Sequence, residues 1–82
     1  MGITNYGRHS LKIFPNPTKG VLNIESTYRI DKIEMLSVHG QIINEYDLHE
    51  IKSIDLTHIE NGLYILKIYS FNQITVRKIL KN

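Results

Sequence analysis

The stretch LYILKIYSFNQITVRKIL, residues 63–80, decides the fold because it contains the longest alternating run of large side chains in the chain. Residues 63–70 alternate with a period of two, as a half-buried strand does, and show no helical period. One face of this run carries Tyr64, Leu66 and Ile68, and the other carries Ile65. Residues 71–73 then turn the chain, and residues 74–80 have the composition of a second strand.

The rest of the chain consists of shorter segments of the same kind, separated by turn signals at intervals of about 8–12 residues. Five further strands are expected, at residues 11–14, 21–26, 30–37, 41–46 and 53–56. Gly40 and Gly62 each end a turn and suit a positive φ, which glycine adopts without a steric penalty. Seven short strands with no helical segment predict an all-β domain built as a sandwich or a barrel.

The composition agrees with this interpretation and limits the possible chemistry. The chain has 14 isoleucines and no alanine, and isoleucine favours pleated, half-buried surfaces. The absence of cysteine excludes disulfides, thiolate metal sites and cysteine nucleophiles. A length of 82 residues allows one domain at most. We expect that domain at residues 11–82, with residues 1–10 as a linker or as residues foreign to the domain.

Charge is distributed unevenly along the chain. The net charge of +2 is too small to indicate nucleic acid binding, but residues 61–82 carry four basic groups and no acid. Those groups are Lys67, Arg77, Lys78 and Lys81. This end of the chain could meet an acidic partner, or it could simply be a solvated strand face. No apolar run approaches the ~20 residues of a membrane span, and no signal-peptide core follows Met1. The chain is therefore expected to be cytosolic or a piece of a larger exported protein.

The segment FPNPTKG, residues 14–20, is the most rigid turn in the chain. Each proline fixes its own φ and holds the preceding residue extended. Asn16 is expected to bond the backbone two residues further on in an Asx-type turn. Gly20 would then allow the dihedral angles with which the chain re-enters a strand. The segment is therefore predicted to be a corner that crosses from one sheet to the other.

The sequence offers no convincing catalytic or metal-binding group. The four histidines, His9, His39, His49 and His58, lack the spacing of a zinc site. Asp55, Thr57 and His58 are near one another, but no nucleophile elbow or oxyanion loop accompanies them. Asp47 and Glu50 form an acidic loop without a cleft around it. We therefore predict no catalytic residue, no cofactor and no bound metal, and we do not expect an enzyme.

Four landmarks occur in a recognisable order. They are Phe14-Pro15-Asn16-Pro17 with Gly20, IEMLSVHGQII at residues 33–43, IDLTHIENGLYILKI at residues 54–68, and RKILKN at residues 77–82. The set resembles the type A C-terminal sorting domain of the type IX secretion system, also called the Por secretion C-terminal sorting domain. The resemblance covers about residues 11–82. The departures are Phe14 for the usual tyrosine, Ser37 for aspartate, Gln41 for a basic residue and Thr57 for serine.

The resemblance implies a seven-stranded immunoglobulin-like β-sandwich that serves as the last domain of a secreted cargo protein. Such cargo enters the periplasm through a separate N-terminal signal and is recognised by the outer-membrane translocon. A sortase-like peptidase usually removes the domain, and the cargo reaches the cell surface or the medium.

By the same resemblance, the residues expected to be exposed for recognition are Arg77, Lys78, Ile79, Leu80 and Lys81. The residues expected to shape the domain are Phe14, Pro15, Asn16, Pro17, Gly20, Gly40, Asp55, Gly62 and Tyr64. The alternatives are a small carbohydrate-binding or adhesive sandwich and a spacer between domains. An open strand edge could also allow a weak homodimer.

Overall fold

The computed structural model describes residues 11–47, 52–71 and 73–82, which form seven strands and no helix. The strands are β1 (Leu11–Phe14), β2 (Val21–Ser26), β3 (Lys32–Ser37), β4 (Ile42–Tyr46), β5 (Ser53–Asp55), β6 (Gly62–Ser70) and β7 (Gln73–Lys81). All seven predicted strands are confirmed, and their bounds differ from the predicted ones by two residues at most. Residues 1–10, predicted to be a linker or foreign to the domain, lie outside the described residues.

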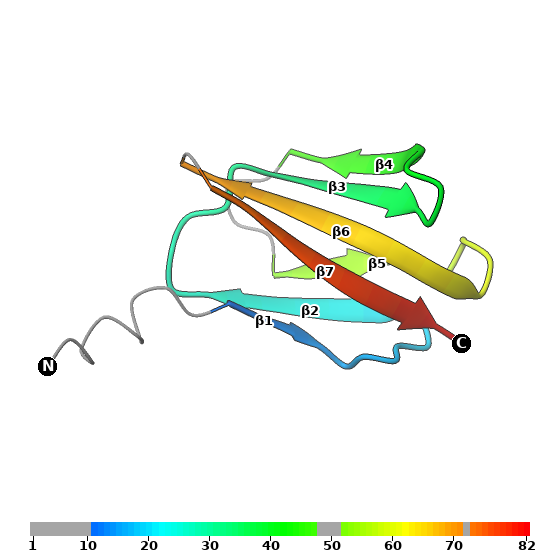
Figure 1. Cartoon of the computed structure of the whole chain (residues 1–82). Coiled ribbons are helices and arrows are strands. Elements are labelled where there is room, and N and C mark those ends of the chain that lie inside the picture. Colours follow the sequence, from blue (N-terminus) through cyan, green and yellow to red (C-terminus); the bar gives the residue numbers. More distant parts are fainter. Residues whose placement is uncertain (1–10, 48–51, 72) are drawn as a thin grey trace, which may run out of the picture.

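The strands form two antiparallel sheets that face each other (Figure 1). The three-stranded sheet has the order β1-β2-β5, and the four-stranded sheet has the order β4-β3-β6-β7. β6 and β7 are the longest strands and pair along their whole length, from Gly62 opposite Lys81 to Ser70 opposite Gln73. The architecture confirms the predicted seven-stranded immunoglobulin-like β-sandwich.

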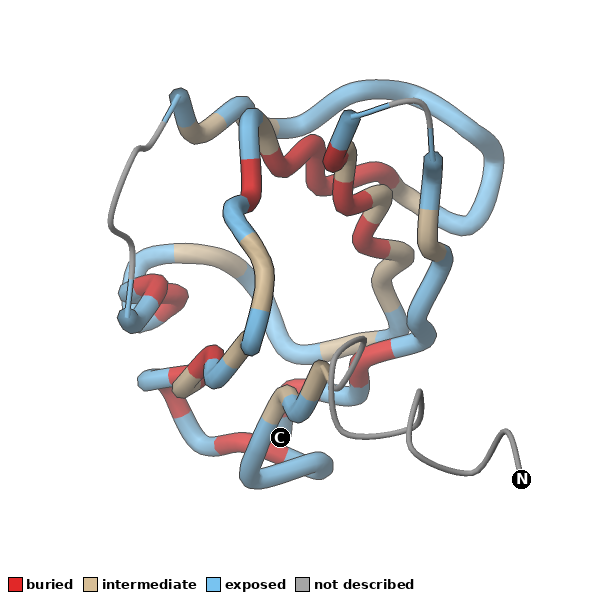
Figure 2. The backbone as a smooth tube through the Cα atoms, turned by 90° about the vertical axis from the view of Figure 1, so that its left-hand side faces the viewer, coloured by how far each residue is buried: buried red, intermediate tan, exposed pale blue. Residues whose placement is uncertain are grey.

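The core lies between the two sheets and consists almost entirely of isoleucine and leucine. Buried positions alternate along β2, at Leu22 and Ile24, and at the end of β6, at Leu66 and Ile68, whereas the four central residues of β3 are all buried (Figure 2). The core cluster contains Leu22, Ile24, Ile30, Ile33, Met35, Ile54, Leu56, Leu66, Ile68 and Ile79. Burying one such side chain stabilises a fold by roughly 1.5–3 kcal/mol, so this cluster is the main source of stability.

The two turn glycines have the conformation that the sequence predicts. Gly40 has a φ of 89° and Gly62 a φ of 153°. In the first of these turns, the Ser37 hydroxyl accepts hydrogen bonds from the His39 and Gln41 amides, each at 3.2 Å. Ser37 thus supplies the turn contact expected of the aspartate that the resembling family usually has at this position.

Candidate functional site: strand β7 and the Pro-Asn-Pro corner

Strand β7 is an edge strand, because in the described part of the chain it pairs with β6 on one side and with no other strand on its opposite side. Its residues alternate between the two faces of the sheet, so neighbouring side chains have opposite surroundings. Ile79 is only 1% exposed and Lys81 only 7%, whereas Arg77, Lys78 and Leu80 are exposed. The expectation that all five predicted recognition residues are exposed is therefore wrong for Ile79 and Lys81.

The ammonium group of Lys81 is held against the turn that precedes β6. Its Nζ donates to the Ile59 carbonyl at 2.7 Å and to the Asn61 Oδ1 at 3.2 Å. These bonds allow a charged side chain to lie in a buried position, since a buried ammonium needs hydrogen-bond acceptors. Lys81 therefore joins the end of β7 to the turn at residues 59–61.

The corner between β1 and β2 lies along the outer edge of β7 (Figure 1). The Asn16 side chain donates from Nδ2 to the Lys78 carbonyl at 2.8 Å, and its Oδ1 accepts from the Leu80 amide at 3.0 Å. A single amide side chain thus satisfies one carbonyl and one N–H of the edge, as a neighbouring strand would. The predicted Asx-type turn at Asn16 is wrong, because its side chain reaches across to the other sheet.

Thr18 continues this contact with its backbone. Its amide donates to the Leu80 carbonyl at 2.8 Å, and its carbonyl accepts from the Asn82 amide at 2.9 Å. The Thr18 hydroxyl accepts from the Gly20 amide at 3.2 Å and donates to the Val21 carbonyl at 2.8 Å. Thr18 is fully buried, and the sequence analysis did not select it. A threonine two residues before a turn glycine was the available signal, since its hydroxyl can bond that amide.

The corner does not cross from one sheet to the other, so that prediction is wrong. β1 and β2 are neighbours in the three-stranded sheet, with Leu11 opposite Ser26 and Phe14 opposite Asn23. The corner connects the sheets differently, through the hydrogen bonds that Asn16 and Thr18 make to β7. Pro15 and Pro17 are exposed, and the peptide bonds that precede them are cis.

Gly20 is required by close packing and not by its dihedral angles. A Cβ atom at Gly20 would lie 2.6 Å from Cγ2 of Thr57, which is closer than carbon atoms approach. The Gly20 carbonyl also accepts from the Leu56 amide at 2.6 Å. The reason predicted for Gly20, freedom of the backbone, is therefore replaced by the approach of the segment at residues 56–57.

Asp55 holds the segment that packs on Gly20. Its Oδ1 accepts from the Thr57 amide at 2.9 Å and from the Thr57 hydroxyl at 2.7 Å. These hydrogen bonds lower the pKa of Asp55 below its ordinary value, the hydroxyl contributing most. Gly20 and Asp55, which are distant in the sequence, are thus joined through Thr57.

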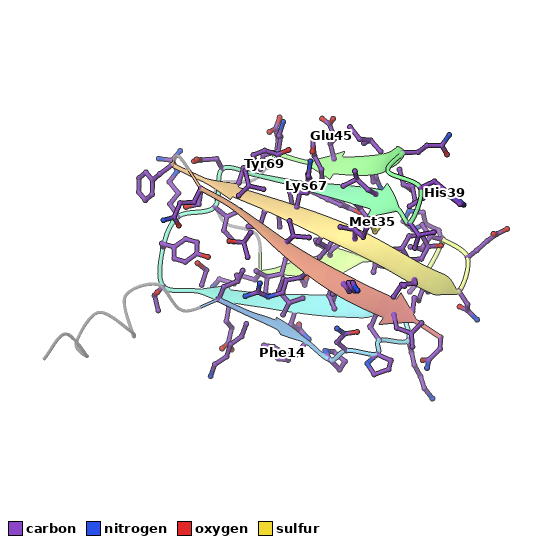
Figure 3. The ribbon with its side chains drawn as sticks, viewed as in Figure 1. Phe14, Met35, His39, Glu45, Lys67 and Tyr69 are labelled. Atoms are coloured by element: carbon purple, nitrogen blue, oxygen red, sulfur yellow. The ribbon has the colours of Figure 1, made fainter. Side chains whose placement is uncertain are left out.

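Phe14 and Tyr64, the two aromatic residues expected to shape the domain, lie in different places. Phe14 is at the end of β1 on the outer side of the three-stranded sheet and is partly exposed (Figure 3). Its carbonyl accepts from the Asn23 side chain at 3.2 Å. Tyr64 is partly buried against the core, and its hydroxyl donates to the Glu60 carbonyl. Tyr64 therefore fixes the turn that Lys81 also contacts.

The outer face of the four-stranded sheet is polar where β3 meets β6 (Figure 3). The Tyr69 hydroxyl donates to Glu34 Oε1 at 2.7 Å, and Lys32 Nζ lies 3.5 Å from Glu34 Oε2 and 4.7 Å from the Tyr69 ring centre. The hydrogen bond from Tyr69 is the largest cause lowering the pKa of Glu34, and it raises the pKa of Tyr69. Along β7, the same face becomes aliphatic, with Ile74, Val76 and Leu80 exposed.

No group of three or more histidine, aspartate or glutamate side chains is placed to hold a metal ion within the described residues. His9, His49 and Glu50 lie outside them. No helix in the described part of the chain is long and apolar enough to cross a membrane.

The fold is that of a small β-sandwich module. Its candidate recognition residues lie on the edge strand β7, beside the Pro-Asn-Pro corner and the turn at residues 59–61. The sequence profile of the family described as secretion system C-terminal sorting domain matches residues 12–82. No curated protein matches the chain. The chain belongs to this family, the C-terminal sorting domains of the type IX secretion system.

Membership gives the domain a role as a C-terminal sorting signal within a larger cargo protein. The cargo travels to the cell surface or to the extracellular space, and the domain engages the secretion machinery. A sorting domain indicates a non-catalytic module.

Proposed function

We propose that the outer-membrane translocon of the type IX system recognises this domain in the periplasm through the exposed side chains of β7. The residues proposed for contact are Arg77, Lys78 and Leu80. The observation that carries the proposal is the exposed basic pair Arg77 and Lys78 on an edge strand, in a terminal segment without acids, on a chain of the sorting family. Ile79 and Lys81, which lie on the opposite face of β7 from Lys78 and Leu80, hold the strand in place by packing and by the bonds to the turn at residues 59–61.

We further propose that a sortase-like peptidase removes the domain after translocation, with cleavage before Leu11. The family matches from residue 12 onward, and β1 begins at Leu11, so a cut before this point would leave the sandwich intact. The mass of an exported fusion protein tests this proposal. An exported protein that retains residues 11–82 would contradict it.

The role of the basic pair is tested with a fluorescent protein that carries a periplasmic export signal and this chain at its C-terminus. The fusion is expressed in a bacterium that has the type IX system. Charge reversal in R77E/K78E should reduce the exported fraction at least about tenfold, because like charges then face an acidic partner. The exported fraction is measured by fluorescence of the medium and of the cell surface.

The matched control is K12E/K52E, which makes the same charge change at exposed positions outside the four-stranded sheet. We expect this control to be exported like the unsubstituted fusion. Thermal unfolding of each purified domain verifies that both variants are folded. Equal export of R77E/K78E and the control would show that the basic pair is not recognised.

A further inference from the structure

The outer edge of β7 is divided into two parts with different hydrogen bonding. Leu80 directs both its N–H and its C=O away from β6, toward Asn16 and Thr18. In an antiparallel ladder the residues that face outward alternate, so Ile74, Val76 and Lys78 direct theirs the same way. The part from the Lys78 carbonyl to the Asn82 amide is covered by the corner.

The part of the edge that precedes Lys78 is open. Among the described residues, no hydrogen bond reaches either backbone group of Ile74 or the N–H groups of Val76 and Lys78. Within residues 11–47, 52–71 and 73–82, the Val76 carbonyl accepts only from the neighbouring Arg77 side chain, at 3.2 Å. Ile74 is 55% exposed and Val76 53% exposed, so apolar side chains flank these backbone groups.

The other sheet edges are less suited to pairing with a further strand. β1 has four residues and β5 has three, so each offers a short ladder. β4 has a register irregularity opposite Met35 and Leu36, and bulges disturb an edge in a way that hinders pairing. β7 has nine residues and a regular ladder to β6. An added strand would therefore find its longest regular template on β7.

We propose that the edge of β7 from Ile74 to the Lys78 N–H binds an extended acidic segment of a partner protein by strand addition. Unpaired backbone groups at alternate positions match the backbone of an extended chain. Arg77 and Lys78 lie beside the open part, and residues 61–82 contain no acid, so the charge favours carboxylates in the partner. Asn16 limits how far the added strand can extend, because its side chain already bonds the next two outward groups along the edge, the Lys78 carbonyl and the Leu80 N–H.

This inference rests on the proposed sorting function for its biological partner, but the pairing itself is measured with a synthetic probe. The probe is a blocked seven-residue peptide of alternating valine and glutamate, and its counterpart has lysine in place of glutamate. Amide hydrogen exchange of the whole 82-residue chain is followed by NMR at saturating peptide. We expect the glutamate peptide to slow exchange at the Ile74, Val76 and Lys78 amides at least about tenfold. The lysine peptide should leave exchange at these amides unchanged.

Two substitutions at one position separate backbone pairing from side-chain contact. V76P removes an outward N–H, and the ladder to β6 is kept because proline is tolerated where the N–H faces solvent. V76T keeps the N–H and changes only the side chain. We expect V76P to weaken peptide binding at least about tenfold and V76T to retain protection of the Ile74 amide. Equal binding by V76P and V76T would overturn strand addition.

Three further outcomes also decide between the possibilities. Protection of the Ile74 and Val76 amides that grows with protein concentration in the absence of peptide would identify a second copy of the chain as the occupant and overturn the proposal. In the export assay, normal export of the V76P fusion would also overturn the proposal, while the sorting function would stand. Failure of the unsubstituted fusion to be exported would instead refute the sorting function, and the exchange measurement would still decide whether the edge pairs.

Discussion

Asn16 shows how much one side chain can contribute when its two polar groups match an exposed strand edge. Among the described residues, Asn16 is the only one outside the four-stranded sheet whose side chain bonds the β7 backbone. Aspartate would lack the donor for the Lys78 carbonyl, and glutamine would place the amide one carbon further out. The spacing of the proline corner from β7 therefore selects asparagine at this position.

Replacing Asn16 by alanine should lower the free energy of unfolding by about 1–2 kcal/mol, because two hydrogen bonds at a partly solvated edge are lost. Hydrogen exchange at the Leu80 amide should become faster, since its acceptor is gone. The matched variant N23A removes a bond between an asparagine side chain and the Phe14 carbonyl, in which β7 takes no part. Unchanged Leu80 exchange in N16A would contradict the assigned role.

Asp55 gives the domain a dependence on acid pH whose direction follows from its lowered pKa. A carboxyl whose pKa is lower in the folded than in the unfolded state stabilises the fold at pH values above the unfolded value. That contribution is lost as the pH falls from the ordinary value of 3.8 through the lowered folded value. Stability should therefore decrease in this acid range as Asp55 takes up a proton.

The variant T57V tests the cause. Valine has nearly the shape of threonine, so the contact with Gly20 is kept while the hydroxyl that bonds Asp55 is removed. We expect the pKa of Asp55, followed by NMR of its carboxyl group, to rise in T57V toward the ordinary value. The backbone bond from the Thr57 position should keep part of the shift. An Asp55 pKa that is the same in both proteins would show that the hydroxyl is not the cause.

At the scale of the element, β7 separates two tasks on its two faces. The inward face contributes Ile79 to the core and Lys81 to the turn at residues 59–61. The outward face carries Lys78 and Leu80, which we propose for recognition together with Arg77, an exposed residue on the same face as Ile79. A truncation of this strand removes both tasks at once, whereas single substitutions can separate them.

The neighbours Ile79 and Leu80 provide such a comparison. I79A should lower the free energy of unfolding by about 2–4 kcal/mol through a core cavity. L80A should lower it by less than about 1 kcal/mol, because its side chain is 39% exposed. Export of the L80A fusion should nevertheless fall, since its side chain belongs to the proposed contact surface. Chemical denaturation measures the stabilities, and a loss in L80A as large as that in I79A would contradict the assignment of faces.

At the scale of the whole molecule, alternation of side chains was sufficient to predict the strands and the class of fold. Leu66 and Ile68 alternate with exposed or partly exposed residues, and such a pattern depends only on local geometry. The turn glycines at positions 40 and 62 were predictable for the same reason, because a positive φ is a local requirement.

The contacts between distant segments could not be predicted in this way. Nothing in the local sequence of Asn16 indicates that its partners are Lys78 and Leu80, since those contacts depend on how the two sheets stack. The burial of Lys81 was missed because lysine is usually exposed, and its acceptors at residues 59–61 lie in a separate turn. The family resemblance identified these positions as important but did not supply their physical reasons.

The hydrogen bonds of Asn16 to β7 have a consequence for the order of events during export. Their partners are 62 and 64 residues away along the chain, so the bonds form only after nearly all of the domain has been synthesised and both sheets have assembled. In a nascent or misassembled cargo, the Lys78 carbonyl and the Leu80 N–H would lack the Asn16 side chain as their partner. In a finished cargo both groups are bonded, and that end of the β7 edge is covered. A secretion machinery that contacts this edge would therefore bind cargo with a fully folded sorting domain in preference to cargo whose sorting domain is incomplete.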